Sequence, residues 1–227
     1  GNHFLARAKD TFKDQTYFLH EVNENEFAKC IFPLSDLNKK EVRKIAIDQD
    51  LITAGKKDSV GICFVGERNL KDFLNRFISF KKGPIKDELG NIIGEHQGSI
   101  LYTQGQRQGL LIGGVKGKDE LPWYVYKKDI QNNEIYVCQG VNNNLLMNSG
   151  LFVENINWIN DIEYVYPIDC LVQIRHQHKP VKCLISNHLK GFMIEFVEPI
   201  RAIAPGQSAV FYDEDICLGG GVISETF

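Results

Sequence analysis

Residues 205–223 read PGQSAVFYDEDICLGGGVI and contain two strand-like apolar runs separated by an acidic turn. We expect strands at residues 209–212 and 216–223, because both runs are apolar and are bounded by turn residues. Similar runs recur upstream, at residues 135–138, 151–156, 170–176, 181–186 and 192–197. Many short strands at near-regular spacing predict a closed β-barrel or a sandwich over residues 134–227.

The periodicity differs in the two segments before the barrel. Residues 84–133 are rich in glycine and carry short strand-like runs at 91–94, 99–102 and 123–126, so we expect a small β-rich central domain. In residues 1–83 the apolar spacing is helical. Helices are expected after residue 23, after a cap at Asp36 or Asn38, and around residues 70–77. The chain is therefore predicted to be α+β.

Composition and charge exclude several classes of protein. The 227 residues are 43% hydrophobic and 24% charged, which is ordinary for a globular chain. No apolar run approaches the roughly 18–20 residues of a membrane span, and the N-terminus has no signal-peptide core, so we expect a cytoplasmic protein without a membrane partner. Residues 1–83 carry a net charge of +3 and residues 84–227 one of −6. A non-specific DNA-binding protein is not indicated, and a polyanion would have to meet a local patch.

The six cysteines and six histidines form no metal-binding motif. There is no C-x-x-C, which excludes zinc ribbons and thioredoxin-type motifs. An even number of cysteines is compatible with disulfides, but nothing indicates secretion, and most are expected to be buried thiols. His176 and His178 share a strand face without a third ligand nearby in the sequence, so no metal site is expected.

Two local patterns are candidates for function. Cys63 lies between Gly61 and Gly66, near cations and before an expected helix, a setting that can lower a thiol pKa and create a nucleophile. The alternative is an ordinary buried cysteine. Residues 13–18 (KDQTYF) combine a cation, an amide and two aromatic rings, which suits contact with phosphates and bases. The alternative there, as for Arg175 on its strand, is an ordinary solvated surface.

Four strings resemble the bacterial tRNA-specific 2-thiouridylase family and occur in that family's order. They are KDQTYFL at 13–19, KDSVGICFVG at 57–66, YTQGQRQGL at 102–110 and PGQSAVFY at 205–212. The resemblance runs from about residue 5 to the C-terminus. It implies that residues 1–83 are the helical end of a truncated Rossmann-like ATP-pyrophosphatase domain, followed by the central domain and the barrel.

The resemblance also implies a reaction and its residues. The family uses ATP, with magnesium, to adenylate the C2 oxygen of the wobble uridine of tRNA, and a cysteine persulfide then supplies sulfur. The persulfide role falls on Cys63, which a sulfur-donor protein would load. The residues that contact tRNA in the family match six positions of this sequence, which are Lys13, Asp14, Gln15, Arg175, His176 and Gln207. The family has tyrosine where this chain has His176.

The family's Ser-Gly-Gly-x-Asp-Ser phosphate loop and its second catalytic cysteine do not occur in this sequence. The chain therefore resembles a C-terminal fragment, and we expect it neither to bind ATP usefully nor to thiolate tRNA alone. A different hypothesis is a non-catalytic RNA-binding β-barrel with a helical appendage. Such a protein would explain residues 84–227 without a role for Cys63.

Overall fold

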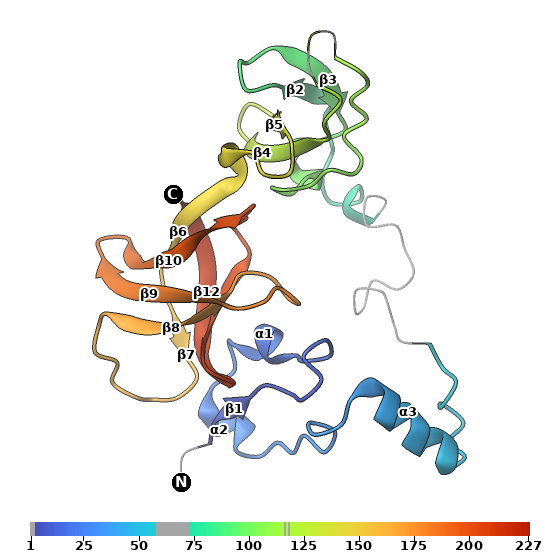
Figure 1. Cartoon of the computed structure of the whole chain (residues 1–227), viewed down its shortest axis with the longest axis vertical. Coiled ribbons are helices and arrows are strands. Elements are labelled where there is room, and N and C mark those ends of the chain that lie inside the picture. Colours follow the sequence, from blue (N-terminus) through green and yellow to red (C-terminus); the bar gives the residue numbers. More distant parts are fainter. Residues whose placement is uncertain (1–2, 58–72, 116, 118) are drawn as a thin grey trace. The chain divides into compact units, whose positions relative to one another are not determined.

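The computed structural model describes residues 3–57, 73–115, 117 and 119–227, and its chain divides into two compact units. The barrel unit comprises Gly1–Lys57, Asn148–Ile200 and Ala204–Phe227, and the central unit comprises Asp58–Met147 and Arg201–Ile203. Figure 1 shows the elements of both units. Among the described residues, no helix has the length and apolar character needed to cross a membrane.

The barrel is a closed antiparallel sheet. Its strands follow one another in the order β12, β11, β8, β9, β10 and β6, and β6 pairs back onto β12 (Figure 1). Their bounds are β6 Met147–Val153, β8 Ile168–Gln173, β9 Val181–His188, β10 Gly191–Arg201, β11 Ser208–Asp213 and β12 Ile216–Thr226. This closure confirms the expected C-terminal barrel. A closed sheet leaves no free edge strand, so the backbone of these strands is paired on both sides.

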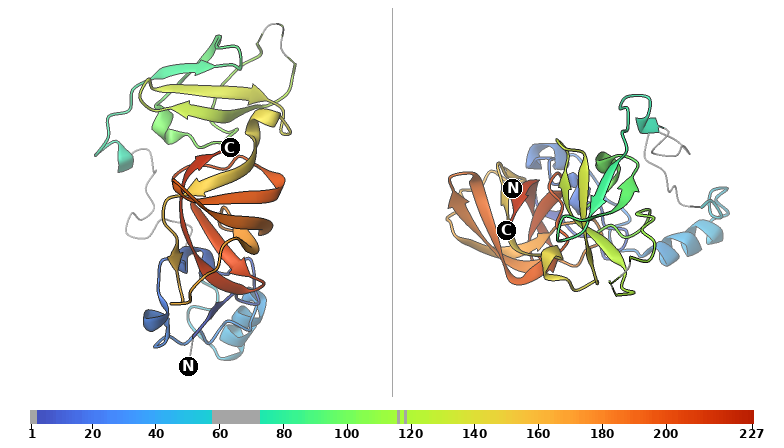
Figure 2. Two further views of the ribbon diagram at one scale, coloured as in Figure 1. Left: turned by 90° about the vertical axis from the view of Figure 1, so that its left-hand side faces the viewer. Right: turned by 90° about the horizontal axis from the view of Figure 1, so that it is seen from above.

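The N-terminal segment covers the outside of the barrel at β11 and β12. Strand β1 (Leu5–Ala6) pairs with β12, and the two lie side by side in Figure 2. A cluster of buried residues joins the segment to the barrel and consists of Leu5, Tyr17, Ile159, Val210, Tyr212 and Cys217. Because one face of β11 meets the barrel interior and the other meets this cover, residues 209–212 are buried on both faces. Their uninterrupted apolar sequence follows from that position.

The glycines at the centre of β12 allow close approach of a neighbouring segment. Short β7 (Asn157–Trp158) pairs with β12 at Gly219 and Gly220. A Cβ on Gly221 would overlap the carbonyl oxygen of Asn155 and crowd a methyl group of Val153. The run of three glycines is therefore a packing requirement of the barrel.

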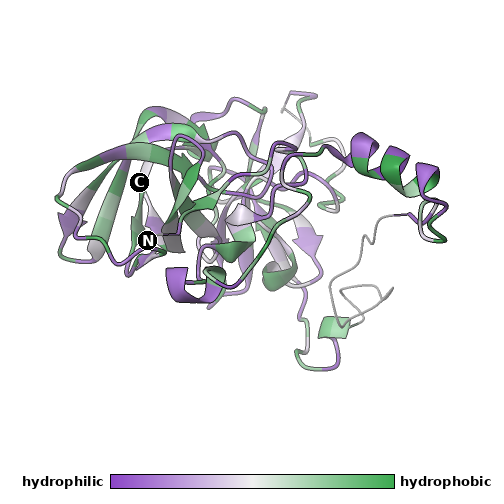
Figure 3. Ribbon diagram, turned by 90° about the horizontal axis from the view of Figure 1, so that it is seen from below, coloured by the Kyte–Doolittle hydropathy of each residue, from purple (hydrophilic) through white to green (hydrophobic). Residues whose placement is uncertain are grey.

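The helices of the barrel unit are α1 (Thr16–Leu19), α2 (Glu24–Phe27) and α3 (Lys39–Asp48). Asn38 caps α3, because its side chain accepts hydrogen bonds from the backbone of Lys40 and Glu41, and Glu41 closes the capping box. This confirms one of the two expected caps. The ribbon of α3 in Figure 3 carries both hydrophilic and hydrophobic residues. The helix expected at residues 70–77 lies partly outside the described residues.

The central unit contains a four-stranded sheet in the order β3, β2, β5, β4. The strands are β2 Gly83–Lys86, β3 Ile92–His96, β4 Trp123–Asp129 and β5 Glu134–Gln139. Ile85, Val125, Ile135 and Val137 form its fully buried centre. The expected β-rich central domain is thus confirmed. The strand expected at residues 99–102 is wrong, because Ser99–Leu101 is a 3-10 helix, as is Asn144–Leu146.

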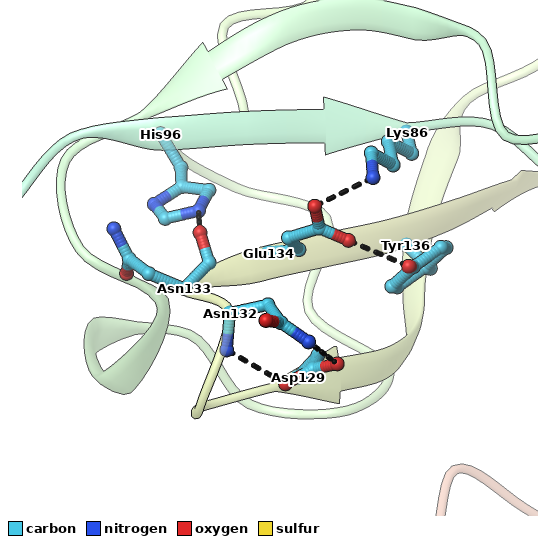
Figure 4. A network of polar contacts seen from close by, with 7 residues as sticks. All are labelled: Lys86, His96, Asp129, Asn132, Asn133, Glu134 and Tyr136. Atoms are coloured by element: carbon cyan, nitrogen blue, oxygen red, sulfur yellow. Dashed lines mark hydrogen bonds and ion pairs between the residues drawn. The ribbon is translucent and has the colours of Figure 1, made fainter.

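Polar side chains hold the β4–β5 turn and the neighbouring strand ends (Figure 4). Asp129 accepts hydrogen bonds from the backbone and side chain of Asn132, as the expected turn requires. His96 is fully buried, and its Nε2 lies 3.0 Å from the carbonyl oxygen of Asn133. Glu134 pairs with Lys86, and hydrogen bonding to that ammonium lowers the pKa of the carboxyl group.

The structure differs from the expected domain limits at two places. Strand β5 pairs with β4 and runs parallel to β2, so it belongs to the central sheet and not to a barrel beginning at residue 134. Residues 1–57 form one compact unit with the barrel. Alternation along a strand indicates the strand itself but not its pairing partners. Here one partner, β4, is adjacent in the sequence, and the other, β2, is distant.

We predict that Gly221→Ala lowers the free energy of unfolding by about 1–3 kcal/mol, because the new methyl group overpacks the barrel. Denaturant unfolding followed by circular dichroism measures this change. The matched control is Val222→Ala on the same strand, whose side chain is 52% exposed and whose truncation should cost much less. Equal stability of Gly221→Ala and wild type would contradict the close packing of residues 155 and 221.

Candidate nucleic-acid interface

Asp14 shapes the loop that precedes α1. Its side chain is buried, and one carboxylate oxygen accepts from the backbone amides of Ala8 and Thr16 at 3.2 and 3.4 Å. The other oxygen accepts from the Thr16 hydroxyl at 2.6 Å. An ionised carboxylate with several donors is a strong local constraint. The structure thus directs the Asp14 carboxylate inward, whereas the side chains of Lys13 and Gln15 on either side are exposed.

Thr16 continues this network into the barrel wall. Its hydroxyl lies 3.2 Å from the hydroxyl of Tyr212 in β11. The Arg7 guanidinium lies 3.8 Å above the Tyr212 ring and donates to Gln173 at the end of β8, with a distance of 2.7 Å. Burial raises the pKa of Tyr212, so its hydroxyl stays protonated. These contacts fix the loop of residues 10–15 against two strands of the barrel.

Tyr17 ties α1 to two further barrel segments. Its buried hydroxyl donates to the carbonyl oxygen of Ser208 at 2.9 Å and lies 3.4 Å from that of Ile174. Burial raises the pKa of Tyr17, which keeps the hydroxyl a donor. Ser208 follows Gln207, and Ile174 precedes Arg175. Tyr17 therefore anchors the backbone beside Gln207 and Arg175, two of the residues expected to contact tRNA.

The loop between β8 and β9 meets the loop before α1. His176 places Nε2 3.2 Å from the carbonyl oxygen of Asp14, and its ring centroid lies 4.6 Å from that of Phe18. Because a carbonyl can only accept, this hydrogen bond requires the proton on Nε2. Gln177 adds a hydrogen bond to the carbonyl oxygen of Phe12 at 3.4 Å. Residues 12–18 and 174–177 thus form one continuous surface, which we call the loop face.

The exposed groups of the loop face are two cations, amides and aromatic rings. Lys13 and Gln15 are exposed and Arg175 is half-buried. The rings of Phe12 and Phe18 are 64% and 58% exposed, far more than aromatic side chains in a core. Burial lowers the pKa of the His178 imidazole, and the nearby positive charge of Arg175 lowers it further. Cations, amides and open rings are the groups that contact RNA phosphates and bases.

Gln207 lies beside this surface but is connected to it through Tyr17. Its side chain is exposed, and its backbone is held by hydrogen bonds with Ala204 and Ile223. Among the described residues, no hydrogen bond joins Gln207 to residues 13–15 or 175–176. Sequence reasoning missed Phe12 and Gln177 as members of the loop face. Phe12 directly precedes Lys13, and an aromatic residue next to a cation and an amide is a signal that could have identified it.

Cys63, the expected catalytic cysteine, lies outside the described residues. The five cysteines that the structure describes are free thiols, of which Cys30 is exposed. Burial raises the pKa of Cys138 to about 11 and that of Cys217 to about 12, so neither is a nucleophile near neutral pH. Among the described residues, no group of three or more His, Cys, Asp or Glu side chains is arranged to hold a metal ion.

Comparison with protein families matches three consecutive domains. Residues 1–67 match the tRNA methyl transferase HUP domain, residues 71–139 the tRNA methyl transferase PRC-barrel domain, and residues 148–223 the aminomethyltransferase beta-barrel domain. The tRNA-specific 2-thiouridylase MnmA of Buchnera aphidicola subsp. Baizongia pistaciae is 48% identical over 224 residues, which is 98% of this chain. The chain belongs to the tRNA-specific 2-thiouridylase family.

Other members of the 2-thiouridylase family show the same extent of similarity. The relatives named tRNA-specific 2-thiouridylase MnmA from Idiomarina loihiensis and Pseudomonas fluorescens are 43% and 46% identical, over 97% and 96% of this chain. The chain spans about 60% of the length of these relatives. The match of residues 1–67 to the HUP domain agrees with the expectation that the N-terminal helices are the end of a Rossmann-like catalytic domain.

We predict that Tyr17→Phe lowers the free energy of unfolding by about 0.5–1.5 kcal/mol, because the carbonyl oxygens of Ser208 and Ile174 lose their shared donor. Denaturant unfolding measures the loss. The control is Phe12→Ala, which removes an exposed ring and should stay within about 0.5 kcal/mol of wild type. A Tyr17→Phe protein as stable as wild type would show that the hydroxyl does not join these segments in solution.

Proposed function

We propose that this chain is the tRNA-binding and sulfur-delivering part of a tRNA-uridine 2-sulfurtransferase, which places sulfur at C2 of the wobble uridine. The observation that carries the proposal is the loop face, where the contact between Asp14 and His176 brings the segments of Lys13, Gln15 and Arg175 together. The relatives are named tRNA-specific 2-thiouridylase, and they share this chain's sequence over nearly its full length.

The residues of the loop face, and Gln207 beside it, have separable tasks in RNA binding. Lys13 and Arg175 are suited to phosphate oxygens, which supply most of the affinity and none of the sequence information. Gln15 and Gln207 can both donate to and accept from base edges, and Phe12 and Phe18 offer faces for stacking. Asp14 is a positioning residue, because its carboxylate is occupied by Thr16 and Ala8.

His176 stands where the family has tyrosine, and its geometry supports a positioning role as well. Its Nε2 is directed to the Asp14 carbonyl, and its ring packs on Phe18. RNA can therefore contact His176 only through its Nδ1 atom and through the side of the imidazole ring that does not face Phe18. We therefore expect His176 to contribute less than Arg175 to tRNA affinity by direct contact.

Sulfur delivery is proposed for Cys63, which would receive a persulfide from a sulfur-donor protein and present it to an activated C2. The preceding activation consumes ATP, with magnesium, in the full-length enzyme. This sequence has no Ser-Gly-Gly-x-Asp-Ser phosphate loop, so its residues do not fit the ATP phosphates. We propose the cytoplasm as the site of the reaction and inactivity of this chain alone.

The tRNA-binding proposal predicts a specific salt dependence. In the full-length protein, Lys13→Ala and Arg175→Ala should each weaken binding of an unmodified tRNA transcript. Each should also reduce the slope of log K against log salt concentration by about one, because one phosphate contact is lost. Gln207→Ala should weaken binding with little change of slope. Filter binding at several salt concentrations measures both quantities.

The matched control for these charge removals is Lys190→Ala. Lys190 lies in the turn at the opposite end of β9 from Arg175, where it pairs with Glu225. It should leave both the affinity and the slope nearly unchanged. If Lys13→Ala and Arg175→Ala bind like this control at low salt, the loop face is not the tRNA-binding surface.

The sulfur-transfer proposal is tested at Cys63. In the full-length enzyme supplied with ATP and a sulfur donor, Cys63→Ser should abolish 2-thiouridine formation and leave tRNA affinity unchanged, because a hydroxyl cannot carry a sulfane sulfur. Mass spectrometry of nuclease-digested tRNA measures the product. Cys30→Ser, at an exposed free cysteine, is the matched control and should retain activity. Normal product formation by Cys63→Ser would show that another residue delivers the sulfur, and this chain would then contribute only RNA binding.

A further inference from the structure

Cys170 and Cys183 lie directly opposite each other on neighbouring strands of the barrel. Cys170 is in β8, Cys183 is in β9, and the two are register partners in the antiparallel pair. Their Sγ atoms are 3.6 Å apart. Both thiols are free in the structure. Neither cysteine has a role in the proposed RNA binding or sulfur delivery.

The backbone already has the geometry of a disulfide. Directly opposed residues in an antiparallel pair have Cα atoms about 4.5 or 5.5 Å apart, and both values fall within the range of about 4.4–6.8 Å found for disulfides. The sulfur atoms must approach by about 1.5 Å to reach a bond length near 2.05 Å. Rotation about the two Cα–Cβ bonds can supply such a movement without a change of register.

A small reagent can reach the pair. Cys170 is half-buried and Cys183 is 3% exposed. Both line a cavity of about 670 Å³ on the barrel unit, together with Leu184, Glu195, Phe196 and Asp213. A cavity of this size is sufficient for a small-molecule ligand.

We propose that Cys170 and Cys183 form a thiol–disulfide exchange site that reacts with low-molecular-weight disulfides such as oxidised glutathione. The Cys170 thiolate attacks one sulfur of the reagent, forming a mixed disulfide and releasing one thiol. Cys183 then loses its proton and attacks the Cys170 sulfur, which releases the second thiol. The two cysteines are oxidised by two electrons to a Cys170–Cys183 disulfide, and the reagent is reduced to two thiols.

The order of the two steps follows from the surroundings of each thiol. The hydrogen bond with Cys170, followed by burial, raises the pKa of the Cys183 thiol. Cys183 therefore holds its proton while Cys170, the more exposed group, meets the reagent first. Once Cys170 is in a mixed disulfide, Cys183 is already placed beside the sulfur that it must attack. The site is independent of the proposed tRNA function.

The disulfide would cross-link the hairpin that presents the loop face. Two register pairs, Leu171 with Lys182 and Val172 with Val181, separate the cysteines from the loop that carries Arg175 and His176. A cross-link at this position restrains both strands at the base of that loop.

The test incubates the folded chain with excess oxidised glutathione at neutral pH, alkylates the remaining thiols and digests with trypsin. Cleavage after Arg175 and Lys182 places the two cysteines in separate peptides, so an oxidised pair is recovered as one linked peptide by mass spectrometry. The peptide of residues 129–175 also contains Cys138, so fragmentation of the linked peptide assigns the bond to Cys170. We expect this linked peptide as the main product and its loss on treatment with reduced glutathione.

Single substitutions distinguish this pair from general oxidation. Cys170→Ser should prevent both the linked peptide and glutathione addition at Cys183, whereas Cys183→Ser should accumulate glutathione on Cys170. Cys217→Ser, at a buried cysteine of the same unit, should behave like wild type. Circular dichroism shows whether each variant is folded. Complete alkylation of Cys170 and Cys183 in the folded wild-type chain, or links to other cysteines, would overturn the proposal.

Discussion

The inward-facing carboxylate of Asp14 is the constraint on which the arrangement of the barrel unit depends most directly. It fixes the turn before α1 through Ala8 and Thr16, and Thr16 passes the contact to Tyr212 in the barrel wall. With residue 14 held in this way, its carbonyl oxygen is in position to receive His176 from the β8–β9 loop. One buried acid thus brings together two segments that are about 160 residues apart in the sequence. The relative placement of Lys13 and Arg175 on the loop face depends on this network.

The same network explains why β11 and β12 are apolar on both faces. A barrel strand normally alternates between a buried inner face and a solvated outer face. Here the outer face is covered by the N-terminal segment, with Leu5 and Tyr17 against Val210 and Tyr212. Close packing on both sides leaves little volume at the centre of β12, which is where the three glycines occur. The cover and the glycines are therefore two consequences of one packing arrangement.

Much of this fold could be predicted from local sequence, and the remainder depends on contacts between distant residues. The barrel strands and the Asn38 cap follow from alternation and capping chemistry within a few residues. Residues 99–102 have strand propensity but form a 3-10 helix, where Ser99 binds the side chain of Asn133. The sequence marked residues 13–18 as a candidate site, yet it did not reveal that Asp14 faces inward. The carboxylate accepts hydrogen bonds from Ala8 and Thr16, and Thr16 in turn lies against Tyr212 of the barrel wall. No local pattern around residue 14 encodes the position of that distant strand.

The uneven charge of the chain bears on the proposed RNA binding at a small face. Residues 84–227 have a net charge of −6, so taken together they repel a polyanion. At physiological salt the Debye length is about 8 Å, so Lys13 and Arg175 act on phosphates only at short range. Attraction therefore depends on the correct face meeting the RNA, and repulsion elsewhere disfavours other orientations. A few well-placed cations on an acidic protein can in this way select one docking geometry, which the proposed reaction at a single nucleotide of a large RNA requires.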